Sequence, residues 1–354
     1  MHPGAAMLFF GLDSLRRIHA GWLQVLGCGA EPTPSWVATE RPGMRLLAYQ
    51  DGAAEGPAIL LVPAPIKRAY IFDLIERASV VRRWREAGRA VFLLEWTDPV
   101  GPSSRYGLAD YADRLLSVAR DTVARALGHD RVVLIGHSLG GTLAALQAAR
   151  RPEGVAALVL LESPLVFDPD IDAFAPWLRT TPAARRLLGG AATVAGSELT
   201  LAAVMAAPDA FLWHRWGDAL ASMSDVERQG LHLRVLRWAL DEIALPAPLL
   251  ADVLQLLYRE NRFRHGTLEL AGMTIGLADI VAPILAVVES DSRVAPPEEV
   301  VPALTLTSSP RRQTFTYESD AGVALAHVGV LVGMDAHRRL WPQIMRWISE
   351  TVDH

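Results

Sequence analysis

Short apolar runs recur along the chain and predict the buried strands of a sheet. Three of them have the β-branched content of buried strands and lack period-two alternation, as is typical of strands covered on both faces. These are AILLV at 58–62, AVFLLEW at 90–96 and RVVLI at 131–135. Further runs, VAALVLL at 155–161 and PILAVV at 283–288, and then QTFTY at 313–317, continue the series of expected strands.

Helical patterns lie between and after these runs. The segment 108–127 places Leu108, Tyr111 and Leu115 at helical spacing, and a closing helix is expected at about 335–350. Strands that alternate with helices predict an α/β protein with a mostly parallel, doubly wound sheet.

The stretch 164–280 does not continue this alternation of strands and helices. It contains prolines, helix-like segments and four tryptophans without clear strand signals, namely Trp177, Trp213, Trp216 and Trp238. We interpret it as a helical cap inserted into a core made of residues 36–163 and 281–354. Residues 1–35 form an N-terminal helical segment, whose amphipathic stretch at 12–27 is expected to pack on its own domain rather than on a partner.

Composition narrows the class of protein. Hydrophobic residues make up 51% of the chain, charged residues 21%, and the formal net charge is −5, so neither disorder nor nucleic-acid binding is favoured. Cys28 is the single cysteine, which excludes internal disulfides and a thiolate zinc site and favours a reducing, cytoplasmic location. The apolar stretch at 7–12 is followed at once by charges and does not resemble a signal peptide, and no run is long enough to span a membrane.

The sequence Gly136-His137-Ser138-Leu139-Gly140-Gly141 follows the strand expected at 131–135 and precedes a predicted helix. In a strand-turn-helix of the pattern G-x-S-x-G, the serine is held on a strained turn with its hydroxyl exposed, and the glycines leave room for close backbone contacts. The motif and its context predict an α/β-hydrolase fold with Ser138 as the nucleophile. The backbone N–H of Leu139 would then point to the oxyanion of a tetrahedral intermediate.

Partners of the serine are expected downstream in the order acid, then histidine. Asp291 follows the strand at 283–288, and His327 follows the last predicted strand. We expect His327 to act as the base and Asp291 to orient it, with Glu289 and Asp320 as nearby alternatives for the acid.

Two further expectations concern the surroundings of the nucleophile. His137 is expected to point into packing rather than to act in catalysis. The second oxyanion donor is expected in the loop at 60–68, where Pro63 and Pro65 lack an N–H, so that Ile66 is preferred over Ala64. The chemistry requires neither a cofactor nor a metal.

Longer motifs carry a more specific signal than the serine turn. These are IKRAYIFDL at 66–74, Glu95-Trp96, RWALDEIALP and LLYRENRF within 237–263, and LADIVAPILAV, APPE, TSSP, HVGVLVG and WPQIMRWI in the last part of the chain. On these motifs the chain, from about 55 to 350, resembles the polyhydroxyalkanoate synthases, specifically the shorter type that works with a partner subunit. The resemblance implies hydroxyacyl-thioester substrates such as acyl-CoA, growth of a polyester, and association with a granule surface, with a partner subunit or in a homo-oligomer.

The chain departs from that family at two positions. The family nucleophile is a cysteine, whereas this chain has Ser138, which depends more on a base and an orienting acid and so favours hydrolysis or a single acyl transfer. An ungapped alignment from Pro283 to Pro297 places Ser292 on the family's catalytic acid, and a turn one residue longer restores Asp291.

Three functions remain open at this point. The first is a serine-dependent esterase, thioesterase or lipase-like enzyme that acts on hydroxyacyl esters or thioesters with water as the acceptor. The second is true polymerisation of hydroxyacyl-CoA. The third is a noncatalytic granule-associated protein, against which the set of Ser138, Asp291 and His327 argues.

Overall fold

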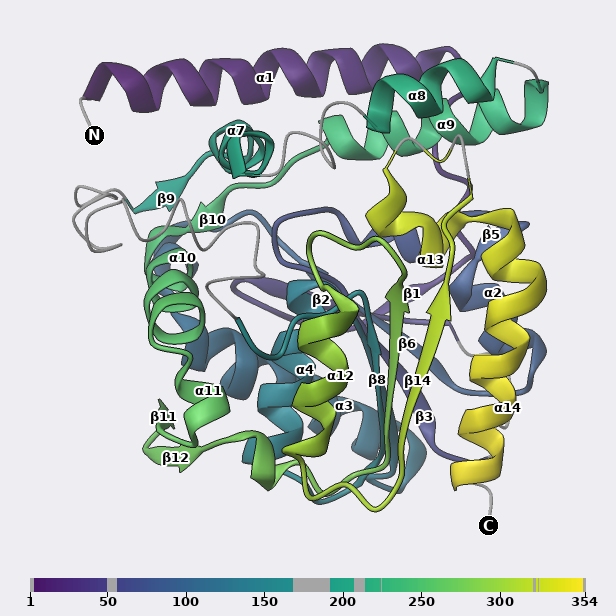
Figure 1. Ribbon diagram of the computed structural model, residues 1–354. Coiled ribbons are helices and arrows are strands. Elements are labelled where there is room, and N and C mark those ends of the chain that lie inside the picture. The colour runs from purple at the N-terminus through teal and green to yellow at the C-terminus, as the bar shows by residue number, and fades with distance from the viewer. Residues whose placement is uncertain are drawn as a thin grey trace.

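The computed structural model of this protein describes residues 3–49, 56–167, 192–206, 214–223, 225–320, 323 and 325–352. The predicted cap residues at 168–191 and Trp213 lie outside this set, and Trp177 falls among them. Figure 1 shows a central sheet between helices, with a layer of further helices above one end of the sheet.

Within the described residues, eight strands form one sheet in the order β1-β2-β6-β3-β7-β8-β13-β14. The strands from β6 to β14 run parallel, and β1 and β2 form an antiparallel hairpin at one edge. Their bounds are β1 Trp36–Arg41, β2 Met44–Ala48, β3 Ala58–Val62, β6 Val91–Trp96, β7 Val132–His137, β8 Val155–Leu161, β13 Ile284–Glu289 and β14 Arg312–Tyr317. The six strands expected from apolar runs are thus confirmed.

The predicted doubly wound arrangement is also confirmed, because helices cover both faces of this sheet (Figure 1). Alternate residues of each strand face opposite ways, so that Leu60 and Leu134 join one core while Ile59 and Val133 join the other. The first core is covered by α3 (Leu116–Leu127), α4 (Leu139–Arg150) and α12 (Pro297–Thr305), and the second by α2 (Val80–Glu86), α13 (Gly329–Val332) and α14 (Trp341–Val352).

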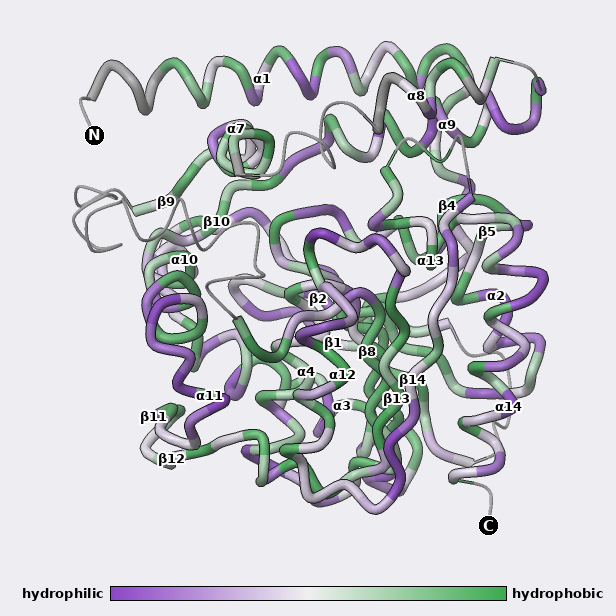
Figure 2. Tube along the Cα trace, viewed as in Figure 1, coloured by the Kyte–Doolittle hydropathy of each residue, from purple (hydrophilic) through white to green (hydrophobic). Residues whose placement is uncertain are grey.

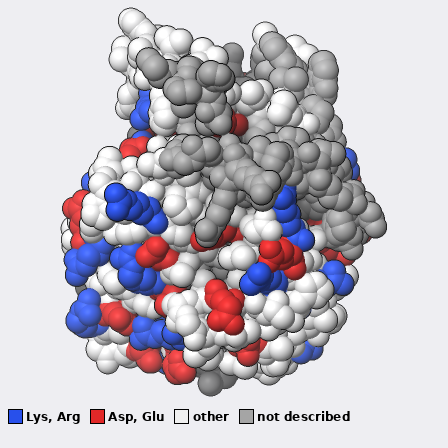
Figure 3. Space-filling model, turned by 90° about the vertical axis from the view of Figure 1, so that its left-hand side faces the viewer, with Lys and Arg blue, Asp and Glu red and all other residues white. Residues whose placement is uncertain are grey.

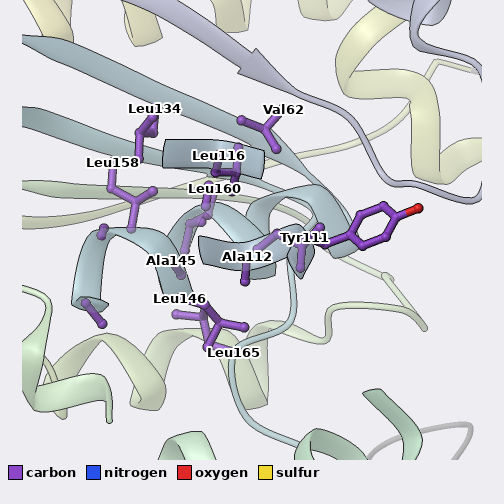
Figure 4. Packing of buried hydrophobic residues seen from close by; sticks show 14 of the residues in the cluster. Val62, Tyr111, Ala112, Leu116, Leu134, Ala145, Leu146, Leu158, Leu160 and Leu165 are labelled. Atoms are coloured by element: carbon purple, nitrogen blue, oxygen red, sulfur yellow. The ribbon is translucent and has the colours of Figure 1, made fainter. Parts of the chain in front are cut away.

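Apolar side chains cover both faces of the inner strands β3, β6, β7, β8 and β13, which explains their continuous hydrophobic runs. Figure 2 shows the trace of these strands as mainly hydrophobic. Figure 4 shows Leu134, Leu158 and Leu160 of neighbouring strands packed with residues of the helices on one face. Each fully buried leucine of this kind contributes roughly 1.5–3 kcal/mol to stability.

The predicted helices begin and end differently from the sequence patterns. The segment 108–127 contains a π-helical stretch, Asp110–Leu115, before α3, and the closing helix is preceded by a second such stretch, Ala336–Leu340. The hairpin of β1 and β2 was not predicted, since β1 has largely exposed residues and little apolar signal.

The described part of 164–280 is mainly helical. Its helices are α7 (Gly196–Ala206), α8 (His214–Ser222), α9 (Val226–Leu240), α10 (Ala247–Asp252) and α11 (Arg262–His265), with a π-helical stretch at Val253–Arg259. Contrary to expectation it also contains short strands, which pair as β9 (Thr193–Val194) with β10 (Leu245–Pro246) and as β11 (Leu268–Leu270) with β12 (Met273–Ile275). The exact division of the chain into core and cap stays a prediction.

The N-terminal helix α1 (Pro3–Val25) lies across α7 and α9 (Figure 1). Asp13 accepts hydrogen bonds from the N–H groups of Gly196 and Ser197 at 3.0 and 2.7 Å, so its carboxylate caps the start of α7. Ala20 and Leu23 pack with Leu240 at the end of α9. No described helix is both long enough and apolar enough to cross a membrane.

Candidate active site

Ser138 stands between β7 and α4 with φ 55° and ψ −134°. A non-glycine residue with positive φ is strained by about 1–3 kcal/mol, and such residues cluster at functional sites. The strained turn is held in place because the N–H of Ser138 donates to the carbonyl oxygen of Leu161 at 2.9 Å. Ser138 is only partly buried and lines a cavity, as the motif predicts for a nucleophile.

The glycines of the motif are required by close backbone contacts. A Cβ on Gly136 would lie 2.3 Å from Cα of Gly141, and one on Gly140 would lie 2.3 Å from the carbonyl oxygen of Val62. Both distances are far below van der Waals contact. The sequence therefore uses glycine so that the start of α4 can pack against the ends of β7 and β3.

His327 lies in a short 3₁₀ turn, Ala326–Val328, between β14 and α13 and lines the same cavity as Ser138. Its side chain is 14% exposed, and burial lowers the pKa of the imidazole to about 4. The structure thus brings together the predicted nucleophile and the predicted base, with the base in its neutral form.

His137 is buried and packs against His327, with the two ring centroids 4.7 Å apart. Its Nε2 donates to the backbone carbonyl oxygen of His327 at 2.9 Å. Burial and the neighbouring His327 lower the pKa of His137 to about 3, so the ring is neutral and fixed as a donor. His137 therefore packs beside the site and holds the backbone of His327.

Asp291 is not brought to His327. It is exposed in the turn after β13, and within the described part of the chain no hydrogen bond or ion pair joins it to another residue. The alternative acid Asp320 accepts the N–H of Asp335 at 2.9 Å instead. The geometry does not support the prediction that Asp291 orients the histidine, because the turn directs Ser292, not Asp291, into the interior.

The carboxylate that faces the histidine is Glu162, whose Oε2 lies 3.6 Å from Nδ1 of His327. Glu162 follows β8 directly, is fully buried and has a positive φ of 49°. Burial raises its pKa to about 7, while hydrogen bonds from Ser292 and from the N–H of Glu289 act in the opposite direction.

Glu162 was not predicted from the sequence, because the acid is normally expected after the next-to-last strand and Glu162 follows the strand before it. One available signal was a carboxylate directly after an apolar strand, at the carboxyl edge where Ser138 also lies. A second was Ser292, which the ungapped alignment placed on the family's acid position.

The expected oxyanion donors lie at the same cavity. Ile66, Ala64 and Leu139 all line it. Leu139 is the first residue of α4, and the first N–H groups of a helix have no partner within that helix. Ile66 lies in a turn closed by a hydrogen bond from the N–H of Lys67 to the carbonyl of Ala64 at 3.3 Å. The assignment of Leu139 and Ile66 as donors stays a prediction.

The cavity above Ser138 has a volume of about 290 Å³, close to the lower end of the ~300–1,000 Å³ usual for small-molecule sites. Its lining is mainly apolar and comes from the loop after β3, from α7 and α9, and from the segment after β10. The apolar lining residues include Phe167, Leu199, Val235, Leu245, Leu250, Val253, Leu254 and Tyr258. Such a lining suits an acyl chain better than a charged peptide.

A buried carboxylate connects side chains of α1 and α7, which form the roof of this cavity, to the loop after β3. Glu242 is 1% exposed, and its Oε1 lies 2.8 Å from Arg16 of α1 and 2.9 Å from Nζ of Lys67. Thr200 of α7 also donates to this oxygen. We call Glu242, Arg16, Lys67 and Thr200 the roof cluster.

Charged side chains outside the cavity are of both signs. On the face shown in Figure 3, acidic and basic side chains are interspersed, without a continuous basic surface. Among the described residues no group of three or more His, Cys, Asp or Glu side chains is arranged to hold a metal ion.

Comparison with known families and sequences gives consistent results. Residues 87–309 match the model of the alpha/beta hydrolase fold. Poly(3-hydroxyalkanoate) polymerase subunit PhaC of Haloarcula marismortui is 28% identical over 90% of this chain and 68% of its own length. The PhaC subunit of Haloferax mediterranei is 29% identical over 90% of this chain and 64% of its length, and that of Allochromatium vinosum is 24% identical over 96% of both.

Solved structures agree on the fold. A carboxylesterase from Nitrososphaera gargenis superposes with a TM-score of 0.51 at 14% identity, over 90% of this chain and 98% of the other. A putative lipase from Sulfolobus solfataricus superposes with a TM-score of 0.55 at 12% identity, over 90% and 99% of the two chains.

Proposed function

The chain belongs to the alpha/beta hydrolase fold family, and from this premise we propose that it is an acyl-transfer enzyme whose nucleophile is Ser138 and whose base is His327. The observation that carries the proposal is the strained Ser138 at the tip of the β7–α4 turn, open to a cavity that His327 also lines. The relatives named as PhaC polymerases support acyl transfer as the reaction class.

In the proposed reaction, Oγ of Ser138 attacks the carbonyl carbon of an acyl ester or thioester. Because Nδ1 of His327 is turned toward Glu162, Nε2 is the nitrogen that takes the serine proton. The tetrahedral intermediate collapses, the bond to the leaving thiol or alcohol breaks, and that group departs with the proton. An acyl-serine ester remains.

An acceptor then attacks the carbonyl carbon of the acyl-serine as His327 removes its proton. The ester bond to Oγ of Ser138 breaks, the acyl group leaves on the acceptor, and the proton passes from His327 to Oγ, which restores the serine. We propose water as the acceptor, since Ser138 replaces the cysteine of the polyhydroxyalkanoate synthases and the cavity is small. The substrate class is a hydroxyacyl ester or thioester whose acyl chain occupies the apolar cavity above Ser138. The reaction takes place without a metal or an organic cofactor.

Polymerisation is the second candidate, and the PhaC relatives favour it. In that case the hydroxyl of an earlier product attacks the acyl-serine and the chain lengthens. Association with a polyester granule and with a partner subunit or a second copy would accompany this function.

One experiment separates the two. Purified protein is incubated with 3-hydroxybutyryl-CoA, thiol release is followed continuously, and the products are separated and identified by mass spectrometry. Hydrolysis gives free hydroxy acid with steady thiol release. Oligomers longer than a dimer, formed without an added partner, would establish polymerisation and contradict water as the acceptor. Absence of thiol release from this thioester, together with absence of phenol release from simple aryl esters, would contradict the proposed activity itself.

A further inference from the structure

The buried site beside His327 is built from two neighbouring strands. β8 and β13 pair in parallel, with Leu161 opposite Val287, and the N–H of Glu162 donates to the carbonyl oxygen of Val287 at 2.9 Å. Glu162 therefore leaves the sheet beside the end of β13, where the sequence order predicts the acid.

Both oxygens of the Glu162 carboxylate are held. Oε1 accepts the backbone N–H of Glu289, and Oε2 accepts the hydroxyl of Ser292 at 2.7 Å. Ser292 is itself fixed, because its Oγ accepts the N–H of Ala295 at 3.1 Å. The same Oε2 faces Nδ1 of His327 at 3.6 Å, so the turn after β13 aims the carboxylate at the imidazole.

No other carboxylate competes for this place within the described residues. Among them, Glu162 is the carboxylate recorded within 4.0 Å of the imidazole of His327. Ser292, at the position of the acid in the ungapped alignment, carries no charge. Its short hydroxyl instead leaves room for the longer side chain that arrives from β8.

From this geometry we propose that Glu162, supported by Ser292, is the positioning residue that orients His327 and stabilises its protonated form. The acid has thus moved from the turn after β13 to the end of β8. This inference rests on the proposed serine chemistry and adds the third member of the catalytic set. Asp291 then has no role in the reaction.

The pH dependence of activity gives a readout that a merely structural residue would not change. The ionisable groups around Glu162 are His327, the adjacent His137, Tyr317 of β14 and Glu289 at the end of β13. The active state has Glu162 ionised and His327 neutral, so activity falls as the pair takes up one proton at low pH. Burial places the pKa of Glu162 at about 7 and that of His327 at about 4, so the acid limb of kcat should lie near 7 in the wild type.

The test compares Glu162→Gln with the matched control Asp291→Asn on an aryl ester. We expect Glu162→Gln to lower kcat by about 10³–10⁴-fold, as neutralised triad acids do, with little change in KM. The pH at which kcat falls on the acid side should move from near 7 toward 4. Asp291→Asn should match the wild type in both respects. The double variant with Glu162→Gln and Ser292→Asp has a carboxylate in the same place, carried by the turn after β13. Its kcat should be at least about tenfold higher than that of Glu162→Gln alone.

A second variant keeps the carboxylate in place. Ser292→Ala removes a hydrogen bond that lowers the pKa of Glu162, so its acid limb should move to higher pH. An acid limb that stays unchanged in Ser292→Ala, or a full-rate Glu162→Gln, would overturn the inference even if the other variant did not fold. A severe defect in Asp291→Asn would also overturn it.

Labelling of the wild type with a fluorophosphonate distinguishes failure of this inference from failure of the proposed function. If Ser138 is labelled but the Glu162 and Asp291 variants do not behave as expected, only the proposed role of Glu162 fails. If Ser138 is not labelled at all, the serine mechanism and the inference both fail.

Discussion

The Nε2 of His137 lies 2.9 Å from the backbone carbonyl oxygen of His327, and this bond connects the turn that carries the proposed nucleophile to the turn that carries the proposed base. His137→Phe would keep a ring in the packing but remove the donor, and the unpaired buried carbonyl would cost about 1–3 kcal/mol. We expect lower unfolding stability together with a lower kcat. Chemical denaturation and ester hydrolysis would measure both, with the exposed His19→Gln as a control for loss of a histidine.

The nucleophile can be tested directly by labelling. Ser138→Ala should abolish both turnover and reaction with a fluorophosphonate, because an unactivated serine does not attack such phosphorus centres. Iodoacetamide should leave activity intact, since Cys28 is buried beneath α1 and does not line the cavity. Labelling that survives in Ser138→Ala would assign the nucleophile to another residue.

The turn between β7 and α4 should tolerate no side chain at Gly140. In Gly140→Ala the Cβ would lie 2.3 Å from the carbonyl oxygen of Val62 and 2.4 Å from the carbonyl carbon of Pro63. Since both are backbone atoms, α4 must shift, and we expect a loss of about 1–3 kcal/mol in stability and most of the activity. Gly21→Ala in α1 is the matched control, because its Cβ meets nothing within 4 Å, and it should stabilise the protein by about 0.5–1 kcal/mol.

The roof cluster should depend on the charge of Glu242. Glu242→Gln leaves Arg16 and Lys67 without their shared anion, and breaking a buried pair in this way costs about 3 kcal/mol or more. The corresponding change at the surface, Glu227→Gln beside Arg77, should cost at most about 1 kcal/mol because that glutamate side chain is 76% exposed. Thermal unfolding of the two variants gives the comparison, and equal losses would contradict the structural role of the cluster.

Much of the fold could be predicted from the sequence because the parallel strands other than the edge strand β14 are buried on both faces. A strand such as β3, apolar at every position, carries a strong signal, whereas β1 lies at an edge with exposed residues and was missed. The short strands β9 and β10 were missed for a different reason: a pairing of two residues each is produced by tertiary contacts and leaves no periodicity to detect.

Ser138 and His327 could be predicted as candidates because each belongs to a local pattern, a glycine-framed turn for the serine and a place after the last strand for the histidine, and the structure places both at one cavity. The carboxylate beside His327 has no such local constraint. Its oxygen must lie near Nδ1, and the ends of two neighbouring strands can both reach that point, so chain order alone could not choose between Asp291 and Glu162.

The helix α1 has a consequence for the order in which the protein assembles during synthesis. Arg16 and Glu242 are separated by 226 residues, and Asp13 meets Ser197 across 184. Helix α1 is therefore synthesised well before the groups that it contacts in α7 and after α9, and contacts of such long separation form slowly. Until then Ala20 and Leu23, which the fold buries, are exposed to solvent and to other nascent chains, at the stage when aggregation competes with folding. Because Arg16 lines the cavity above Ser138, that cavity is complete only after α1 has met α7 and α9.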